Sequence, residues 1–287
     1  MRIPPYWSKG TFSDLDRNGK RLTFSAWGWS FESPQAAAED GAARARRAFA
    51  RITEGEKPES YDYLDRPLRE EIVDSVTCDG EIVGLVTRNR YGSLILNAPH
   101  ACFVDVDFPL LRPQGWWDAV LLGLSRGRRR QRMKSEREVV LQSVRDWAAT
   151  NPRRSGRLYR TAAGLRLLLV DGLYDPLAAE TAALLEALGS DALYRRLTLK
   201  QECFRARLTP KPWRCGCPRP PYCYPWETAA AEAAHRRWQS EYEAAARPYA
   251  TCRLVEEFGA PAANGQIAAI VDFHDRFTLR DPQAMLA

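Results

Sequence analysis

The sequence lacks any hydrophobic run long enough to span a bilayer, and it has no internal repeat or low-complexity tract. Its first residues, MRIPPYWSKG, do not contain the apolar stretch of a signal peptide. We therefore expect a cytoplasmic protein without a membrane partner. No P-loop, helicase segment or second catalytic domain is apparent in the sequence.

The number and spacing of the cysteines argue against a disulfide-stabilised protein. The seven cysteines are odd in number and irregularly spaced, which argues against a disulfide framework. What the chain does have is ordinary globular composition, with 45% hydrophobic residues in 287 positions, and a formal net charge of +6. The cationic excess favours an acidic partner, such as a nucleotide or nucleic acid, where the cations cluster.

The order of predicted elements indicates an α+β fold, with an antiparallel or mixed sheet and flanking helices. Residues 1–58 are expected to form a hairpin with a turn at Asn18-Gly19, followed by a helix that Ser33 caps. Residues 59–225 are expected to form the main α+β domain, beginning with an antiparallel meander of three β-rich runs between Glu70 and Phe108. Residues 226–287 are expected to be a C-terminal helical segment, in which QIAAIVDFHD is compatible with a strand or a helix.

Two aspartates stand out in the apolar run CFVDVDFP. In a strand, Asp105 and Asp107 project from one face and Val104 and Val106 from the other. Two neighbouring carboxylates repel each other, and Mg²⁺ or Mn²⁺ is a usual compensation because these ions prefer carboxylate oxygens. The same pattern also occurs where both residues lie at an exposed strand end or pair with arginine.

Two further segments follow this strand in a specific order. YRTAAGLR contains a glycine turn, and DALYRRLTLKQECFRARLTPKPWR begins with Asp191 and contains many cations. This order resembles the archaeo-eukaryotic primase (primase-polymerase) superfamily, in which an Asp-x-Asp strand precedes a Ser-x-His near glycine and a third acidic residue. The resemblance covers roughly residues 60–215 and concerns motif order only.

The resemblance implies a metal-dependent nucleotidyltransferase with a primase-polymerase-like core that acts on nucleotides or nucleic acid. Asp105, Asp107 and Asp191 would be its catalytic carboxylates, with the first two binding Mg²⁺ or Mn²⁺. Asp171 is an alternative third carboxylate. The candidate nucleotide- and phosphate-binding residues are Arg88, Arg90, Arg160, Arg166, Arg205, Arg207 and Lys211.

One position departs from the family pattern. Arg166 stands where the family has a histidine, and none of the three histidines lies in this hairpin. Arginine can bind phosphate through two hydrogen bonds, and it can equally mark a protein that binds nucleic acid without catalysis. A third alternative is a phosphodiesterase or nuclease, because a metal–carboxylate site serves both the formation and the cleavage of a phosphodiester.

Four cysteines suggest a second metal. Cys215, Cys217 and Cys223 lie in a proline-rich loop, and Cys203 or His235 could complete a structural Zn²⁺ site, although the Cys-x-Cys spacing is tighter than usual. The alternative is a set of free thiols. The basic run SRGRRRQRMK could contact phosphates without sequence specificity or form a solvated helix face.

Overall fold

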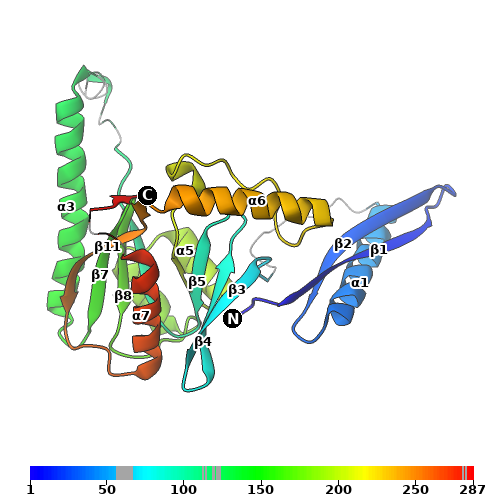
Figure 1. Ribbon diagram of the computed structural model, residues 1–287, viewed down its shortest axis with the longest axis horizontal. Coiled ribbons are helices and arrows are strands. Elements are labelled where there is room, and N and C mark those ends of the chain that lie inside the picture. Colours follow the sequence, from blue (N-terminus) through cyan, green and yellow to red (C-terminus); the bar gives the residue numbers. More distant parts are fainter. Residues whose placement is uncertain are drawn as a thin grey trace.

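The chain forms two four-stranded antiparallel sheets with flanking helices, and a hairpin–helix unit stands beside them at the N-terminus (Figure 1). The α+β class expected from the sequence is thus confirmed. No helix within the described ranges is long and apolar enough to cross a membrane. The computed structural model describes residues 1–55, 67–111, 113, 115–117, 120, 124–279, 281 and 283–287.

The N-terminal unit consists of β1 (Tyr6–Leu15), β2 (Arg21–Ser30) and α1 (Pro34–Thr53). Gly19 has a φ of 77°, which the tight turn between the strands requires. The Ser33 side chain accepts a hydrogen bond from the backbone N–H of Ala36, and proline opens the helix. The predicted hairpin, cap and helix are therefore all present.

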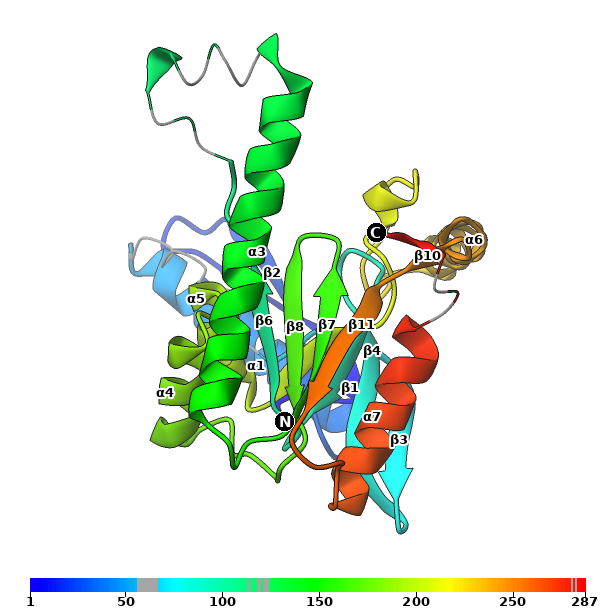
Figure 2. The same ribbon diagram turned by 90° about the vertical axis from the view of Figure 1, so that its left-hand side faces the viewer.

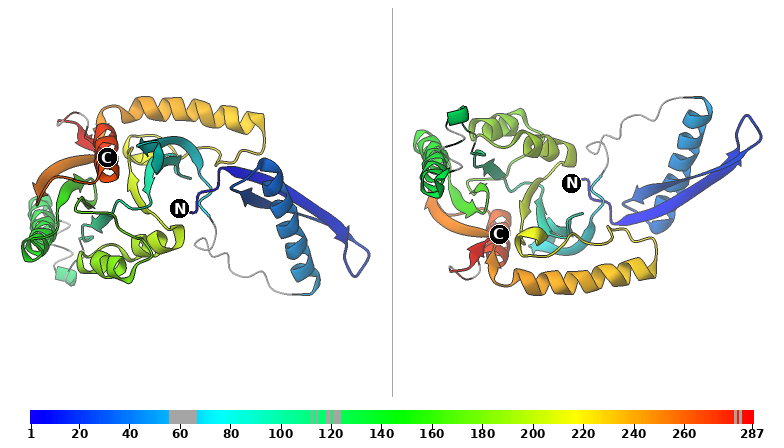
Figure 3. Two further views of the ribbon diagram at one scale, coloured as in Figure 1. Left: turned by 90° about the horizontal axis from the view of Figure 1, so that it is seen from below. Right: turned by 90° about the horizontal axis from the view of Figure 1, so that it is seen from above.

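Helix α1 lies unusually close to the hairpin because glycines line the contact. A Cβ atom on Gly10 would lie 2.0 Å from the backbone nitrogen of Ala42, and one on Gly28 would lie 2.1 Å from that of Gly41. Seen from below and above, this unit extends away from the rest of the molecule (Figure 3).

The first four-stranded sheet has the order β3-β4-β5-β9. Its strands are β3 (Glu71–Cys78), β4 (Glu81–Arg88), β5 (Leu94–Ala98) and β9 (Phe204–Arg207). The first three form the predicted antiparallel meander. The third β-rich run does not continue as one strand, because Pro99 has no N–H to donate and the ladder ends before it.

The remainder of that run becomes β6 (Phe103–Asp107) in the second sheet, whose order is β11-β7-β8-β6. The other strands are β7 (Gly156–Thr161), β8 (Gly164–Leu169) and β11 (Cys252–Phe258). β6 lies at the edge of this sheet, and among the described strands it pairs with β8 alone. The expectation that residues 226–287 are helical is corrected by β11, whose alternating burial reflects pairing with β7 on one edge of this sheet.

Helices cover both sheets (Figure 2), and α3 crosses the face of the second sheet. QIAAIVDFHD forms part of a helix, α7. The helices are α3 (Arg126–Thr150), α4 (Ala179–Ala187), α5 (Ala192–Gln201), α6 (Ala229–Ala246), α7 (Gly265–Thr278) and the 3-10 turn η2 (Pro212–Arg214). Two short strands, β10 (Tyr249–Ala250) and β12 (Met285–Leu286), pair in parallel.

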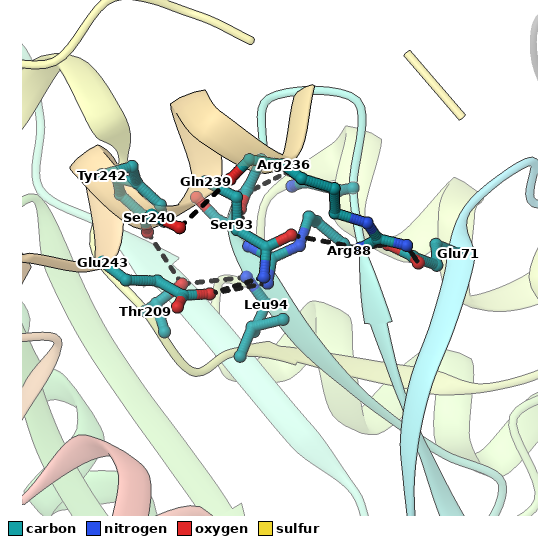
Figure 4. A network of polar contacts seen from close by, with 12 residues as sticks. Glu71, Arg88, Ser93, Leu94, Thr209, Arg236, Gln239, Ser240, Tyr242 and Glu243 are labelled. Carbon is teal, nitrogen blue, oxygen red and sulfur yellow. Dashed lines mark hydrogen bonds and ion pairs between the residues drawn. The ribbon is translucent and has the colours of Figure 1, made fainter. Parts of the chain in front are cut away.

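Both sheets and α7 contribute to one hydrophobic core. Leu96 of β5, Leu167 of β8 and Ile267 of α7 are all buried in it. A polar network joins α6 to the first sheet (Figure 4): Arg88 Nη2 donates to Glu243 at 3.0 Å, and Arg236 pairs with Glu71. The C-terminal segment is therefore integrated with the central sheets through both β11 and α6.

Candidate active site

Asp105 and Asp107 lie on the same face of β6, as strand alternation predicts. Val104 and Val106 point to the opposite face and are buried, whereas Asp105 is partly exposed and Asp107 is exposed. Asp107 faces Gly164 across the β6–β8 ladder, where a Cβ would lie 2.2 Å from the Val106 carbonyl oxygen. The glycine of the hairpin thus permits close approach of β8 to the end of the aspartate strand.

Asp191 meets this strand from α5. Its backbone N–H donates to the carbonyl oxygen of Asp105 at 3.4 Å, and its carboxylate caps the helix by accepting from the backbone N–H of Tyr194. Burial raises the pKa of Asp107, and the charges of Asp105 and then Asp191 raise it further. Asp191 therefore lies beside the strand that carries Asp105 and Asp107.

Asp171, the alternative third acid, lies elsewhere. It follows the opposite end of β8 from the Asp107–Gly164 pair. Its carboxylate accepts from Arg154 at 2.9 Å and from the hydroxyl of Tyr174 at 2.9 and 3.0 Å. Asp171 is thus part of a separate ion pair.

Arg166 pairs with Asp105 across the sheet. Their strands place them opposite each other, with Nε to Oδ1 at 2.9 Å and Nη2 to Oδ2 at 3.3 Å. Arg166 is almost completely buried. The arginine pairing that the sequence left open for an Asp-x-Asp strand is thus present at Asp105, while Asp107 remains at the exposed strand end.

The third nitrogen of this guanidinium contacts α7 and β9. Arg166 Nη1 donates to the Arg207 carbonyl oxygen at 2.9 Å and lies 3.4 Å from His274 Nε2. Burial lowers the pKa of His274, so its imidazole is neutral. Since Asp275 lies 2.9 Å from Nδ1, the proton is assigned to Nδ1, and Nε2 accepts from Arg166.

His274 and Asp275 are the functional candidates for which sequence reasoning had the least basis. The sequence offers only the motif DFHD, more than a hundred residues after Arg166. His274 is fully buried against the rings of Phe103 and Tyr159, and Tyr159 donates its hydroxyl to Asp275 at 2.7 Å. His274, held by Asp275, therefore positions the buried guanidinium of Arg166.

Two predicted phosphate ligands, Arg207 and Lys211, lie beside the carboxylates and form no ion pair with any residue that the structure describes. Arg207 and Lys211 both lower the pKa of Asp107, against the opposing effect of burial. Burial and then Arg207 lower the pKa of Lys211. Within the described residues, the buried Nε of Arg207 has no hydrogen-bond partner. A cavity of about 170 Å³ opens here, lined by Asp105, Arg207, Arg205, Tyr194, Asn89 and Thr198.

The other predicted phosphate ligands divide into two groups. Arg205 donates to the buried Glu70 at 2.6 Å, and Arg88 is buried in the α6 network. Like Arg166, both are engaged within the protein. Arg90 is exposed and lies over the ring of Tyr91, and Arg160 faces a second, larger cavity.

This basic cavity, between α3 and the second sheet, has a volume of about 590 Å³. Phe108, directly after Asp107, forms part of the apolar lining of this cavity. The guanidinium groups of Arg137 and Arg160 lie 5.4 and 5.7 Å from the centroid of its ring. Burial, Arg137 and Arg253 lower the pKa of Arg160. In the part of the chain that is described, no carboxylate lies within ion-pair distance of its five cations, Arg129, Arg130, Lys134, Arg137 and Arg160.

The four candidate zinc ligands are free thiols in three environments. Cys203 is buried before β9, Cys215 and Cys217 lie near each other after η2, and Cys223 is exposed beside the Arg90 carbonyl. His235 is buried, and its Nδ1 lies 2.8 Å from the Tyr222 carbonyl oxygen. Among the described residues, no three His, Cys, Asp or Glu side chains form a group that could hold a metal ion. The zinc site stays a prediction from sequence.

The carboxylates offer a different donor set. Mg²⁺ binds through one or two carboxylates together with substrate phosphates and water, and so needs no complete protein cage. Asp107 is exposed, and one oxygen of Asp191 caps α5 while the other carries no hydrogen bond within the described ranges. These two groups fit such an ion, whereas both oxygens of Asp105 already accept from Arg166.

Comparisons were made with protein families, with curated proteins and with solved structures. None of the three finds a match to this chain. Functional inference therefore depends on the side chains described above.

Proposed function

We propose that the protein is a metal-dependent nucleotidyltransferase that acts on nucleotides or nucleic acid. The primase-polymerases, which its motif order resembles, have this activity. One observation carries the proposal: the backbone of Asp191 meets the Asp105–Asp107 strand, and the charges of Asp105, Asp191, Lys211 and Arg207 all act on the Asp107 carboxyl group. Acids beside cations that form no ion pair within the described residues can bind a metal–triphosphate, because the acids attract the ion and the cations attract the phosphates.

Asp107 and Asp191 are the residues that would hold Mg²⁺ or Mn²⁺. When bound, the ion would activate the attacking hydroxyl and stabilise the pyrophosphate leaving group. Asp107 is suited to this role, because burial and then the charges of Asp105 and Asp191 raise its pKa, and a bound cation would offset those charges. Arg207, whose Nε lacks a partner within the described part, and Lys211 would contact the phosphates.

Asp105 and Arg166 take a different role from the one the resemblance implies. Because the two oxygens of Asp105 accept from Arg166, Asp105 fixes the guanidinium and shapes the wall of the 170 Å³ cavity. Arg166 is anchored in turn by Arg207 and His274. The pair thereby holds β8, β9 and α7 in position around Asp107.

The same pair favours a second candidate function, a nucleic-acid binding protein without catalysis. An arginine that neutralises Asp105 reduces the negative charge available to a metal. The basic cavity beside Phe108 would then carry the function by binding phosphates.

The experiment that separates these functions measures incorporation of labelled nucleotides with Mn²⁺ or Mg²⁺ on primed and unprimed templates. Asp107→Asn and Asp191→Asn should abolish product, whereas Asp272→Asn, an exposed carboxylate on α7, should leave it unchanged. Product that persists in both site variants would refute the catalytic assignment. Tight nucleic-acid binding without product under either metal would establish the second function, and cleavage of the template would indicate a phosphodiesterase.

A further inference from the structure

A group of three tryptophans lies on the face of the N-terminal hairpin opposite α1. Trp7 and Trp29 are directly paired across β1 and β2, and Trp27 follows on the same face opposite Lys9. The rings of Trp7 and Trp29 lie 5.5 Å apart. All three tryptophans are partly exposed, and α1 contacts the other face of the hairpin through glycines. Of the three rings, that of Trp29 is also in contact with α1, because the Arg44 guanidinium lies 3.5 Å from its centroid.

A cavity of about 250 Å³ separates this tryptophan face from the main body. Its opposite wall carries two exposed arginines, Arg69 and Arg90, with Tyr224 beside them. The Arg69 guanidinium lies 5.7 Å from the Trp27 ring centroid. Within the described ranges, neither arginine is in an ion pair. The cavity therefore combines flat aromatic surfaces with cations that have no acidic partner.

The 250 Å³ cavity, called the tryptophan cavity below, and the 170 Å³ cavity beside Asp105 are lined by residues that are neighbours in the sequence. Arg90 lines the first, and its neighbour Asn89 lines the second together with Asp105. On the other side, Gln201 lines the first cavity and accepts from Arg205, which lines the second. Neighbouring residues thus line both cavities, and Asp105 of the second cavity is on the strand that ends at Asp107.

We propose that the tryptophan cavity, lined by Trp7, Trp27, Trp29, Arg69, Arg90 and Tyr224, binds an unpaired base of single-stranded nucleic acid. Aromatic side chains stack on bases of any sequence, and arginines contact the flanking phosphates. A duplex does not satisfy this site, because its bases are stacked on each other. The inference rests on the proposed function in one respect, because it takes the nucleic-acid strand bound here to be the one that reacts at Asp107.

Binding is measured by fluorescence anisotropy of a labelled single-stranded oligonucleotide and of its duplex, using the full chain with Asp107→Asn and no metal. Trp27→Leu, which keeps an apolar side chain but removes the ring, should weaken single-strand binding about tenfold. Trp27→Phe should retain most of the affinity, and Phe31→Leu, an exposed ring outside the cavity, serves as the matched control. Arg69→Ala with Arg90→Ala should weaken binding without loss of the tryptophan face.

Thermal unfolding of each variant separates recognition from folding. Reduced affinity in the arginine variant at unchanged melting temperature supports the inference even if Trp27→Leu destabilises the hairpin. Unchanged affinity in both the folded Trp27→Leu protein and the arginine variant would overturn it, as would equal affinity for duplex and single strand. Nucleotide incorporation that is independent of Trp27 and Arg69 would refute this inference alone. Ring-dependent binding without incorporation would refute the proposed function alone.

Discussion

Arg166 and Asp105 form a two-point ion pair between neighbouring strands, with Nε to Oδ1 at 2.9 Å and Nη2 to Oδ2 at 3.3 Å. The arginine side chain is 3% exposed and the aspartate 34%. This asymmetry matters, because the buried cation depends on the carboxylate for its compensation.

Asp105→Asn should therefore destabilise the fold by about 2–4 kcal/mol, since it leaves a buried guanidinium with a neutral partner. Chemical denaturation measures the change, with Asp272→Asn as a control that should lie within about 0.5 kcal/mol of wild type. Replacing both members, Arg166→Met with Asp105→Leu, should recover much of the loss. A single variant as stable as wild type would contradict a structural role for the pair.

Asp107→Asn should stabilise the fold, in contrast to Asp105→Asn. The pKa of Asp107 is raised above its ordinary 3.8 in the folded protein, so ionisation costs stability at neutral pH and the cost disappears below about pH 3.8. The variant should gain less than about 1 kcal/mol at pH 7, because the side chain is exposed. Thermal unfolding across pH measures this gain, which should vanish in acid.

Mg²⁺ or Mn²⁺ should make the wild type more stable than Asp107→Asn. An ion bound at Asp107 and Asp191 at a concentration a hundred times its Kd stabilises the wild type by about 2.7 kcal/mol. Asp107→Asn and Asp191→Asn should show much smaller shifts in Tm than Asp272→Asn. Equal shifts in all of these proteins would argue against the carboxylate ion site.

Arg137→Ala and Arg160→Ala test the basic cavity. If both cations contact phosphates, each substitution should weaken nucleic-acid binding for all sequences alike and reduce the slope of log K against log salt by about 1. Arg153→Ala, at an exposed position after α3, is the matched control. A salt slope unchanged in the double variant would exclude the cavity as a phosphate site.

Gly28→Ala tests the close packing of the N-terminal unit. Its Cβ would lie 2.1 Å from a backbone nitrogen in α1, a clash that no side-chain rotation relieves, so we expect a loss of about 3 kcal/mol in that unit. Near-ultraviolet circular dichroism and limited proteolysis follow the hairpin separately from the central sheets. Gly172→Ala, where nothing lies within 4 Å, should be neutral. Equal behaviour of the two variants would contradict the packing described.

Local features were predictable from the sequence because their partners lie within a few residues. The Asn18-Gly19 turn, the Ser33 cap and the three-stranded meander follow from backbone conformation and side-chain alternation. The same alternation placed Asp105 and Asp107 on one face. It did not show that Pro99 divides a run between two sheets, or that β11 joins β7 from the far end of the chain.

The partners of the charged groups were decided only by the tertiary structure. Arg166 meets residues 61 and 108 positions away, and each of these contacts depends on sheet register and helix docking. The sequence could thus identify candidate cations but could not divide them into those with acidic partners, such as Arg205, and those without one in the described part of the chain, such as Arg207. That division is a matter of distance and burial, which only the folded chain determines, and it decides which charges remain available to a ligand.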